Sequence, residues 1–430
     1  MKAFVENRFG LLVLVLVALG ALYGVAFVTT PAPAAPQPPG QRKAPVESAA
    51  LVCPAPRGAT VAVYKQGAMA AKKVKDTTPY AVSGPGGLEA GIITRTTAGA
   101  ERGLSGVRCT EPAPITWLVG PGPADATVTL YLANADKAPA MADVLVYAAE
   151  GMVSGDKGLG LELAPGEHRE IDLRTLAPSA DIMAVSVTTV LGRVAVAARA
   201  ELRGKGVDWI PSAQPPATRV VVPGIPGGGG TRELLVAAPG DRDASVQVRA
   251  VSQDATYAMK GRETLDVPAG AVASMDVTTG IGGEAAALVL TSETPIVAGV
   301  VVASTGNAQD VAFTAGTAPL DLGATVADNG KGSRLVLTAP SGPGKVSVQV
   351  VPGGRPAEVS IPAGRTKEVK LSGKGTFGVV VTPVSGQVYG GRVIQERAGD
   401  GVLVTIRPLA PGRTWTLVPT LRDDPSVVLP

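Results

Sequence analysis

Short runs of alternating apolar and polar residues recur along most of this chain. Ala244-Ser-Val-Gln-Val-Arg-Ala250 and Val346-Ser-Val-Gln-Val-Val351 place alanine or valine at every second position. A β-strand turns successive side chains to opposite faces, so this period of two predicts strands with one buried face. Glycine and proline lie between the runs, where turns are expected. The pattern predicts an all-β protein.

The same order of sequence features occurs three times along the chain. A Pro-x-x turn leads into a strand-like run and then into a valine-rich strand, over Pro165–Val190, Pro268–Val302 and Pro362–Val384. A repeated pattern of this kind decides the fold class before any residue chemistry does. About seven short strands in each copy are typical of an immunoglobulin-like β-sandwich. We predict β modules over 115–213, 232–320 and 333–419, linkers over 214–231 and 321–332, and a tail over 420–430.

The N-terminus has a different pattern. Residues 1–9 are a short polar head, residues 10–29 are almost wholly apolar, and residues 30–47 are rich in proline. Twenty helical residues rise about 30 Å, the thickness of the hydrocarbon core of a bilayer. We interpret these segments as a cytoplasmic head, an uncleaved membrane anchor and an extended stalk, with the rest of the chain exported. A cleaved signal peptide is the alternative, because Ala32-Pro-Ala34 resembles a cleavage site.

The chain has two cysteines, Cys53 and Cys109, and both follow the apolar segment. Exported chains meet an oxidising environment, so the pair predicts a disulfide. We expect it to pin a small β subdomain over residues 48–114. Two cysteines and one distant histidine do not make a set of four metal ligands, so we predict no metal site and no cofactor.

Composition and charge narrow the class of partner. The apolar fraction of 45% is enough to fold a chain that holds 54 glycines and 37 prolines. The net charge of +3 gives little attraction for nucleic acid. Lys72-Lys73-Val74-Lys75 is the main basic cluster, and we interpret it as solvated. We therefore predict no nucleic-acid partner.

Candidate nucleophile and base residues are few. His168 is the only histidine, and the other copies of the repeat have Ala271 and Arg365 at its position. A position that accepts all three residue types indicates a surface turn rather than a catalytic base. Ser154-Gly-Asp-Lys157 matches the Ser-x-x-Lys of penicillin-binding enzymes, but no Lys-Thr-Gly or Ser-Asp-Asn follows it.

The acidic and glycine-rich segments also lack a catalytic or binding pattern. Strand alternation places Glu167, Glu170 and Asp172 on a solvent face rather than in an acid and base pair. Asp241-Arg-Asp243 alone is too short for a calcium loop. The glycine-rich segments lack the spacing of a phosphate loop and are read as turns; they are 84–87, 227–230 and 341–345. We predict no enzyme activity.

The order of signals in the modules, which includes Thr291-Ser-Glu-Thr-Pro-Ile-Val-Ala-Gly299, resembles a repeat of bacterial extracytoplasmic proteins. With the anchor, the stalk and the cysteine pair, the chain resembles an uncharacterised family of actinobacterial membrane-anchored or secreted proteins, a domain of unknown function. The first module departs from this pattern at Thr188–Val196, where the others have Pro or Ser before the final strand. The resemblance implies an envelope role and brings no catalytic residues.

Trp117, Trp209 and Trp415 lie beside aliphatic residues at opening or closing strands, so we predict that they pack in cores. The alternative is a sugar-stacking platform. We therefore predict a non-catalytic, single-pass protein of the cell membrane, tethered by residues 10–29. Its extracytoplasmic modules would serve adhesion, scaffolding or partner binding, with envelope proteins or glycans as partners. The alternative function is glycan binding that assists cell-wall or polysaccharide assembly.

Overall fold

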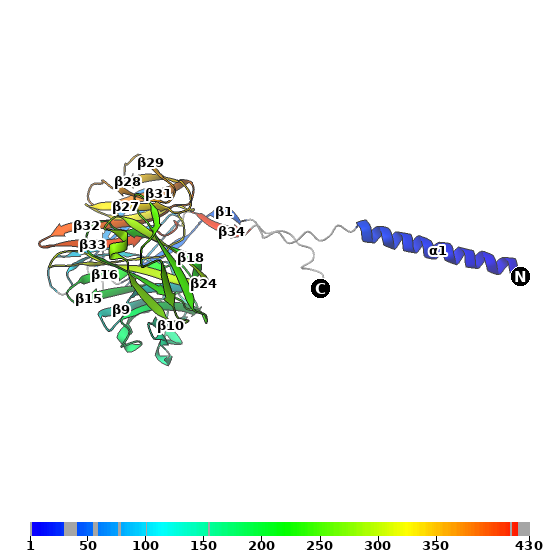
Figure 1. Ribbon diagram of the computed structural model, residues 1–430, viewed down its shortest axis with the longest axis horizontal. Helices are drawn as coiled ribbons and strands as arrows, with labels where there is room; N and C mark the ends of the chain where they lie inside the picture. The colour runs from blue at the N-terminus through cyan, green and yellow to red at the C-terminus, as the bar shows by residue number, and fades with distance from the viewer. Residues whose placement is uncertain are drawn as a thin grey trace. The chain divides into compact units, whose positions relative to one another are not determined.

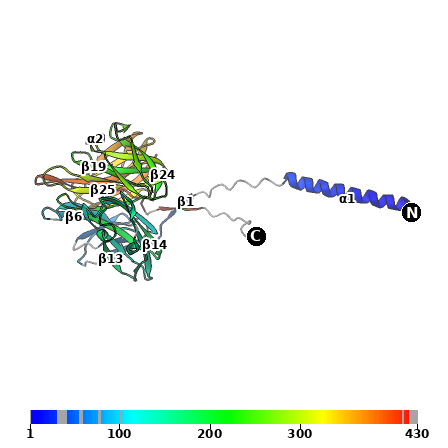
Figure 2. The same ribbon diagram turned by 60° about the horizontal axis from the view of Figure 1, so that its bottom comes forward.

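The computed structural model describes residues 2–29, 41–54, 59–75, 79–99, 101–153, 155–412 and 415–419. The chain divides into two compact units, residues 1–44 with 417–430, and residues 45–416. The second unit is built almost wholly of strands that pack against one another (Figures 1 and 2). The all-β prediction is confirmed.

The first unit contains a helix and a strand pair. Helix α1 spans Lys2–Thr29, and β1 (Gln41–Pro45) pairs with β34 (Trp415–Pro419). No described helix combines the length and apolar character that crossing a membrane requires, so the span predicted over residues 10–29 is not supported. The end of the predicted stalk is a strand because it finds a partner in β34. The rest of the stalk and the predicted tail lie mostly outside the described residues.

The cysteine-paired subdomain has two small sheets. One pairs β2 (Ala49–Cys53) with β5 (Tyr80–Gly84). The other has the order β4 (Ala68–Lys73), β3 (Thr60–Lys65), β6 (Glu89–Thr96) and β7 (Gly103–Arg108). The predicted disulfide between Cys53 and Cys109 is confirmed. Both cysteines are fully buried in the core between the sheets.

Residues 115–213 form the next pair of sheets. The first sheet has the order β11 (Gly151–Val153), β10 (Ala140–Ala148), β14 (Ile182–Leu191), β8 (Ile115–Pro121) and β17 (Ser212–Ala213), with β12 (Leu161–Leu163) also on β10. The second has the order β13 (His168–Asp172), β9 (Ala126–Ala133), β15 (Ala195–Leu202) and β16 (Gly206–Ile210). Two short 3-10 helices interrupt the strands, η1 (Asp156–Gly158) and η2 (Leu173–Thr175).

Residues 217–315 are organised around one long strand, β24 (Ala286–Ala303). Its first half pairs with β18 (Ala217–Ile225) and β20 (Ala244–Val251), and β20 also pairs with β21 (Thr256–Ala258) and β22 (Thr264–Val267). Its second half pairs with β19 (Thr231–Ala237) and β25 (Val311–Ala315), and β19 pairs with β23 (Val272–Asp276). A single-turn helix, α2 (Thr278–Ile281), follows β23. The alternation read in the sequence holds, because buried and exposed residues alternate over Ala244–Arg249.

Residues 324–408 form the last pair of sheets. One has the order β26 (Ala324–Asn329), β31 (Phe377–Ser385), β28 (Gly344–Val351) and β29 (Ala357–Ile361). The other has the order β30 (Arg365–Lys370), β27 (Ser333–Ala339), β32 (Tyr389–Ala398) and β33 (Gly401–Pro408).

The predicted linkers contain strands. Within 214–231 lies β18, and within 321–332 lies β26. Their glycines and prolines suggested connecting segments, but Val220, Val222 and Val326 are buried in the cores of the sheets that follow. Each strand therefore belongs to the next pair of sheets.

Neighbouring pairs of sheets share their cores. Phe313 on β25 is fully buried among residues of the 115–213 sheets. Val404 and Ile406 on β33 are buried in the core built around β24. The parts of residues 45–416 are therefore fused by apolar packing rather than joined by flexible connections.

Candidate functional site

A cleft of about 220 Å³ opens between the cysteine-paired subdomain and the sheet of β9, β15 and β16. Every second residue of a strand faces it, as the alternation of a strand requires. The subdomain wall is Ile92, Thr94 and Thr96 on β6 with Gly103, Ser105 and Val107 on β7. The opposite wall is Tyr131 on β9, Arg199 on β15, and Val207 and Trp209 on β16. Two sheet faces thus meet without filling the space between them.

Two aromatic rings form one side of the cleft. The ring centroids of Tyr131 and Trp209 are 5.2 Å apart, and the ring planes are tilted by 47°. Both side chains are half-buried, and Trp209 also packs against the subdomain core. That cluster includes Ile92 and Val107 of the subdomain wall, so packing between the two walls fixes the position of the indole.

Polar groups lie on both walls of the cleft. The Ser105 side chain is buried, with 4% exposure, and within the described part of the chain its Oγ has no hydrogen-bond partner. Arg199 and Glu101 form an ion pair at 3.3 Å, with side-chain exposures of 25% and 53%. A pair exposed to this degree is screened by water and weak. The cleft therefore offers the hydroxyls of Thr94 and Thr96, a carboxylate and a guanidinium for hydrogen bonding.

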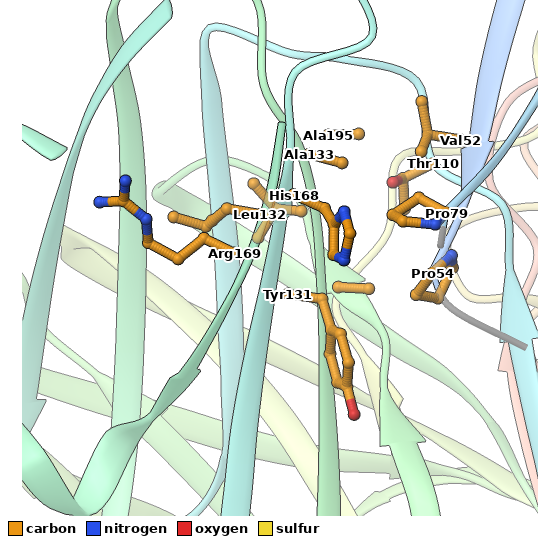
Figure 3. A pocket seen from close by; sticks show the side chains of 12 residues that line it. Val52, Pro54, Pro79, Thr110, Tyr131, Leu132, Ala133, His168, Arg169 and Ala195 are labelled. Carbon is orange, nitrogen blue, oxygen red and sulfur yellow. The ribbon is translucent and has the colours of Figure 1, made fainter. Parts of the chain in front are cut away.

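His168 lies beside the cleft rather than in it. It is exposed at the start of β13 and faces a notch of about 10 Å³, with Pro54, Pro79 and Tyr131 nearby (Figure 3). That volume holds about one water molecule. The described residues of the notch include no serine, cysteine or carboxylate. Its surface position agrees with the sequence prediction.

A buried polar junction lies on the other face of the cleft strands. Strand β7 contacts β16 and β33, and β25 contacts the same two strands, so the four edge strands form a closed ring. The side chain of Asp208 on β16 is fully buried and accepts a hydrogen bond at 2.8 Å from the N–H of Gly106 on β7. This bond ties together the two strands that carry Ser105 and Trp209.

Asp310 makes the corresponding link to the remaining strands. It lies just before β25 and is fully buried. Its Oδ2 accepts from the N–H of Leu104 at 2.9 Å and of Val404 at 2.8 Å, and its Oδ1 accepts from the N–H of Val311. Burial raises the pKa of Asp310 to about 7, although these hydrogen bonds act to lower it. Burial likewise raises the pKa of Asp208 well above its ordinary value.

Ion pairs extend the junction toward β6. Arg407 on β33 pairs with Asp328 on β26 and, at 2.7 Å, with Glu89 on β6. Arg392 pairs with Asp328 at 3.2 Å, and Arg108 pairs with Glu89 at 2.8 Å. Arg392 is fully buried, and all the others but Arg108 are nearly so. Charges buried this deeply are tolerated only when they are paired.

The predicted tryptophan positions have mixed outcomes. Trp117 is buried, 5.7 Å from the ring of Tyr147, so its core prediction is confirmed. Trp209 packs against the subdomain core and also lines the cleft. Trp415 is 44% exposed, so its core prediction is wrong. It lies on β34, which pairs with β1 in a two-stranded sheet.

The other candidate residues are at the surface or outside the described residues. Glu170 and Asp172 are exposed on β13, as expected, and Glu167 pairs with Arg169 at 2.9 Å. In the basic cluster, Lys72 lies over the ring of Tyr80. Ser154 lies outside the described residues. Among the described residues, no group of three or more His, Cys, Asp or Glu could hold a metal ion.

Sequence reasoning missed both the cleft and the junction. The junction did leave a signal at Asp208, between Val207 and Trp209-Ile210, and at Arg407, which directly follows Ile406. A charge inside a core strand indicates a buried partner. Ser105 left no signal, since serine is also common in turns.

The comparison with curated proteins finds no match to the chain. A protein-family model matches residues 46–372, from the cysteine-paired subdomain through β30. The match includes both walls of the cleft and agrees with the resemblance to an uncharacterised domain. The chain belongs to the family of unknown function DUF5719.

Proposed function

We propose that this protein is a non-catalytic binding protein of the cell envelope that serves adhesion, scaffolding or partner binding. The cleft between β7 and β16 is the observation that carries the proposal. It joins aromatic rings, hydroxyl groups and a weak ion pair on two rigid walls, which is the usual composition of a ligand site. In this proposal the three pairs of sheets over residues 115–408 are repeated immunoglobulin-like sandwiches that hold the walls.

A location outside the cytoplasm is part of the proposal. The disulfide between Cys53 and Cys109 supports it, because such bonds persist in oxidising compartments and are rare in the cytosol. Attachment to the cell membrane rests on the apolar sequence of residues 10–29 alone. Fractionation of cells that express the full chain tests this part, since a tethered protein sediments with membranes.

Binding without catalysis is supported by where the perturbed acids lie. A carboxyl group with a raised pKa is a common sign of acid or base catalysis. Asp208 on β16 and Asp310, just before β25, however, point into the junction, where backbone N–H groups hold them. Their environment is that of a structural crosslink between strands.

Glycan binding that assists wall or polysaccharide assembly is the second candidate function. The paired rings of Tyr131 and Trp209 favour it, because an aromatic pair on one module is the feature that sugar stacking needs.

The purified full chain should bind saturably to isolated envelope material, separated into a protein fraction and a polysaccharide fraction. Trp209→Ala should weaken that binding at least tenfold, because buried aromatic anchors dominate binding energy. Absence of saturable binding to both fractions would refute the binding function. Release of shortened glycans during incubation would refute the non-catalytic part.

A further inference from the structure

We propose that the cleft binds one neutral sugar ring of an oligosaccharide, stacked on Trp209 beside Tyr131 and hydrogen-bonded by Ser105. The inference rests on the proposed binding function and names its ligand class. Four features of the cleft carry it: its size, its aromatic pair, its unpartnered buried hydroxyl and its balanced charge.

The size of the cleft favours a single ring. Its volume of about 220 Å³ lies below the lower end of typical pockets for drug-sized ligands and cofactors, about 300 Å³. An oligosaccharide can place one ring in such a space while its neighbours remain in solvent.

The aromatic pair matches the shape of a sugar. A pyranose ring presents C–H groups on its faces and hydroxyl groups around its rim. The half-buried rings of Tyr131 and Trp209 offer apolar faces to the C–H groups, and each ring also carries a polar tip. An aliphatic ligand would gain the apolar contact but would leave the polar groups of both walls without partners.

Ser105 supplies an independent sign of a ligand. A buried hydroxyl without a hydrogen bond is costly, and most buried polar atoms in folded proteins have a partner. The Oγ of Ser105 has no partner among the described residues. Its neighbours on the same face of β7, Gly103 and Val107, carry no polar side-chain group that could bond it. The Oγ is shielded from solvent in this conformation, so in this proposal a rotation about the Cα–Cβ bond turns it to the cleft, where a sugar hydroxyl can both donate to it and accept from it.

The charges of the cleft favour a neutral ligand. Glu101 and Arg199 oppose each other, so the lining carries one negative and one positive group. An anionic sugar would meet the carboxylate of Glu101, and a cationic sugar would meet Arg199. Rim hydroxyls can instead accept from Arg199 and donate to Glu101 without displacing either charge.

The test measures binding of the full chain to two panels of oligosaccharides by titration calorimetry. One panel holds neutral gluco-, manno-, galacto- and arabino-oligosaccharides, and the other holds uronate-containing ones. Ser105→Ala should weaken binding of a neutral oligosaccharide about 3- to 10-fold, the effect of one lost hydrogen bond. Trp209→Ala should weaken it more than about 10-fold. Trp415→Ala, which changes an exposed tryptophan outside the cleft, is the control and should leave affinity unchanged.

Ser105→Ala keeps the test decisive if Trp209→Ala does not fold, because removing an unpartnered hydroxyl should not lower the thermal midpoint. Binding confined to the uronate panel, or neutral binding that Ser105→Ala leaves unchanged, would overturn the inference. Saturable binding to the envelope protein fraction without binding to any oligosaccharide would overturn it too, while the proposed binding function would stand. Loss of both kinds of binding would end both proposals.

Discussion

Asp310 makes the stability of this protein depend on pH in an unusual direction. An ordinary aspartate titrates near 3.8, whereas burial raises the pKa of Asp310 to about 7 in the folded chain. Arg102 is the nearby cation, and the buried carboxyl of Asp208 is the neighbouring acid. Between pH 4 and pH 7 the folded state therefore binds more protons at this site than the unfolded state does.

The direction and the size of the change in stability follow from the linkage between proton binding and folding. Because the folded state holds the extra proton, the free energy of unfolding falls as pH rises through the folded pKa. A shift from 3.8 to about 7 corresponds to a loss of about 2 to 3 kcal/mol between pH 5 and pH 8. Asp208 is shifted in the same direction and adds to the loss.

Urea unfolding of the full chain at several values of pH from 5 to 8 measures this effect. The unfolding free energy should decrease across the range, most steeply at its acidic end between pH 5 and pH 6, and should level off above pH 7. Asp310→Asn cannot titrate, so its profile should lose most of that slope even if the variant is less stable throughout. Asp241→Asn, at an exposed position, is the matched control and should keep the wild-type slope. A wild-type profile that is flat or rises with pH would refute the reasoning.

Three further changes test other parts of the structure by urea unfolding. Arg407→Met leaves buried carboxylates without their partner and should cost about 3 to 5 kcal/mol; a cost below about 1 kcal/mol would mean that the junction is solvated. Replacing Cys53 and Cys109 together by alanine opens a loop with a sequence separation of 56 and should cost about 4 kcal/mol, whereas no change would show that the bond does not form. Trp117→Ala should cost about 3 to 5 kcal/mol and Trp415→Ala under about 1 kcal/mol, so equal costs would contradict the burial difference.

The strands could be predicted from the sequence because alternation is a local property. Ala244–Arg249 alternates buried and exposed in the fold as it alternates apolar and polar in the sequence. The strands β18 and β26 were mistaken for linkers because glycine and proline near Val220–Val222 and Val326 hid short buried runs. Their burial comes from partners far along the chain, and composition carries no information about those partners.

The amino-acid sequence by itself determined the all-β class, the single disulfide and the surface position of His168. Each of these depends on local periodicity or on the scarcity of a residue type. Only the tertiary structure decided that Ser105 and Trp209 face one cleft and that Asp208 and Asp310 close a ring of edge strands behind it. The physical reason is that alternation assigns residues to the two faces of a sheet, but which sheet faces meet depends on packing between segments about a hundred or more residues apart.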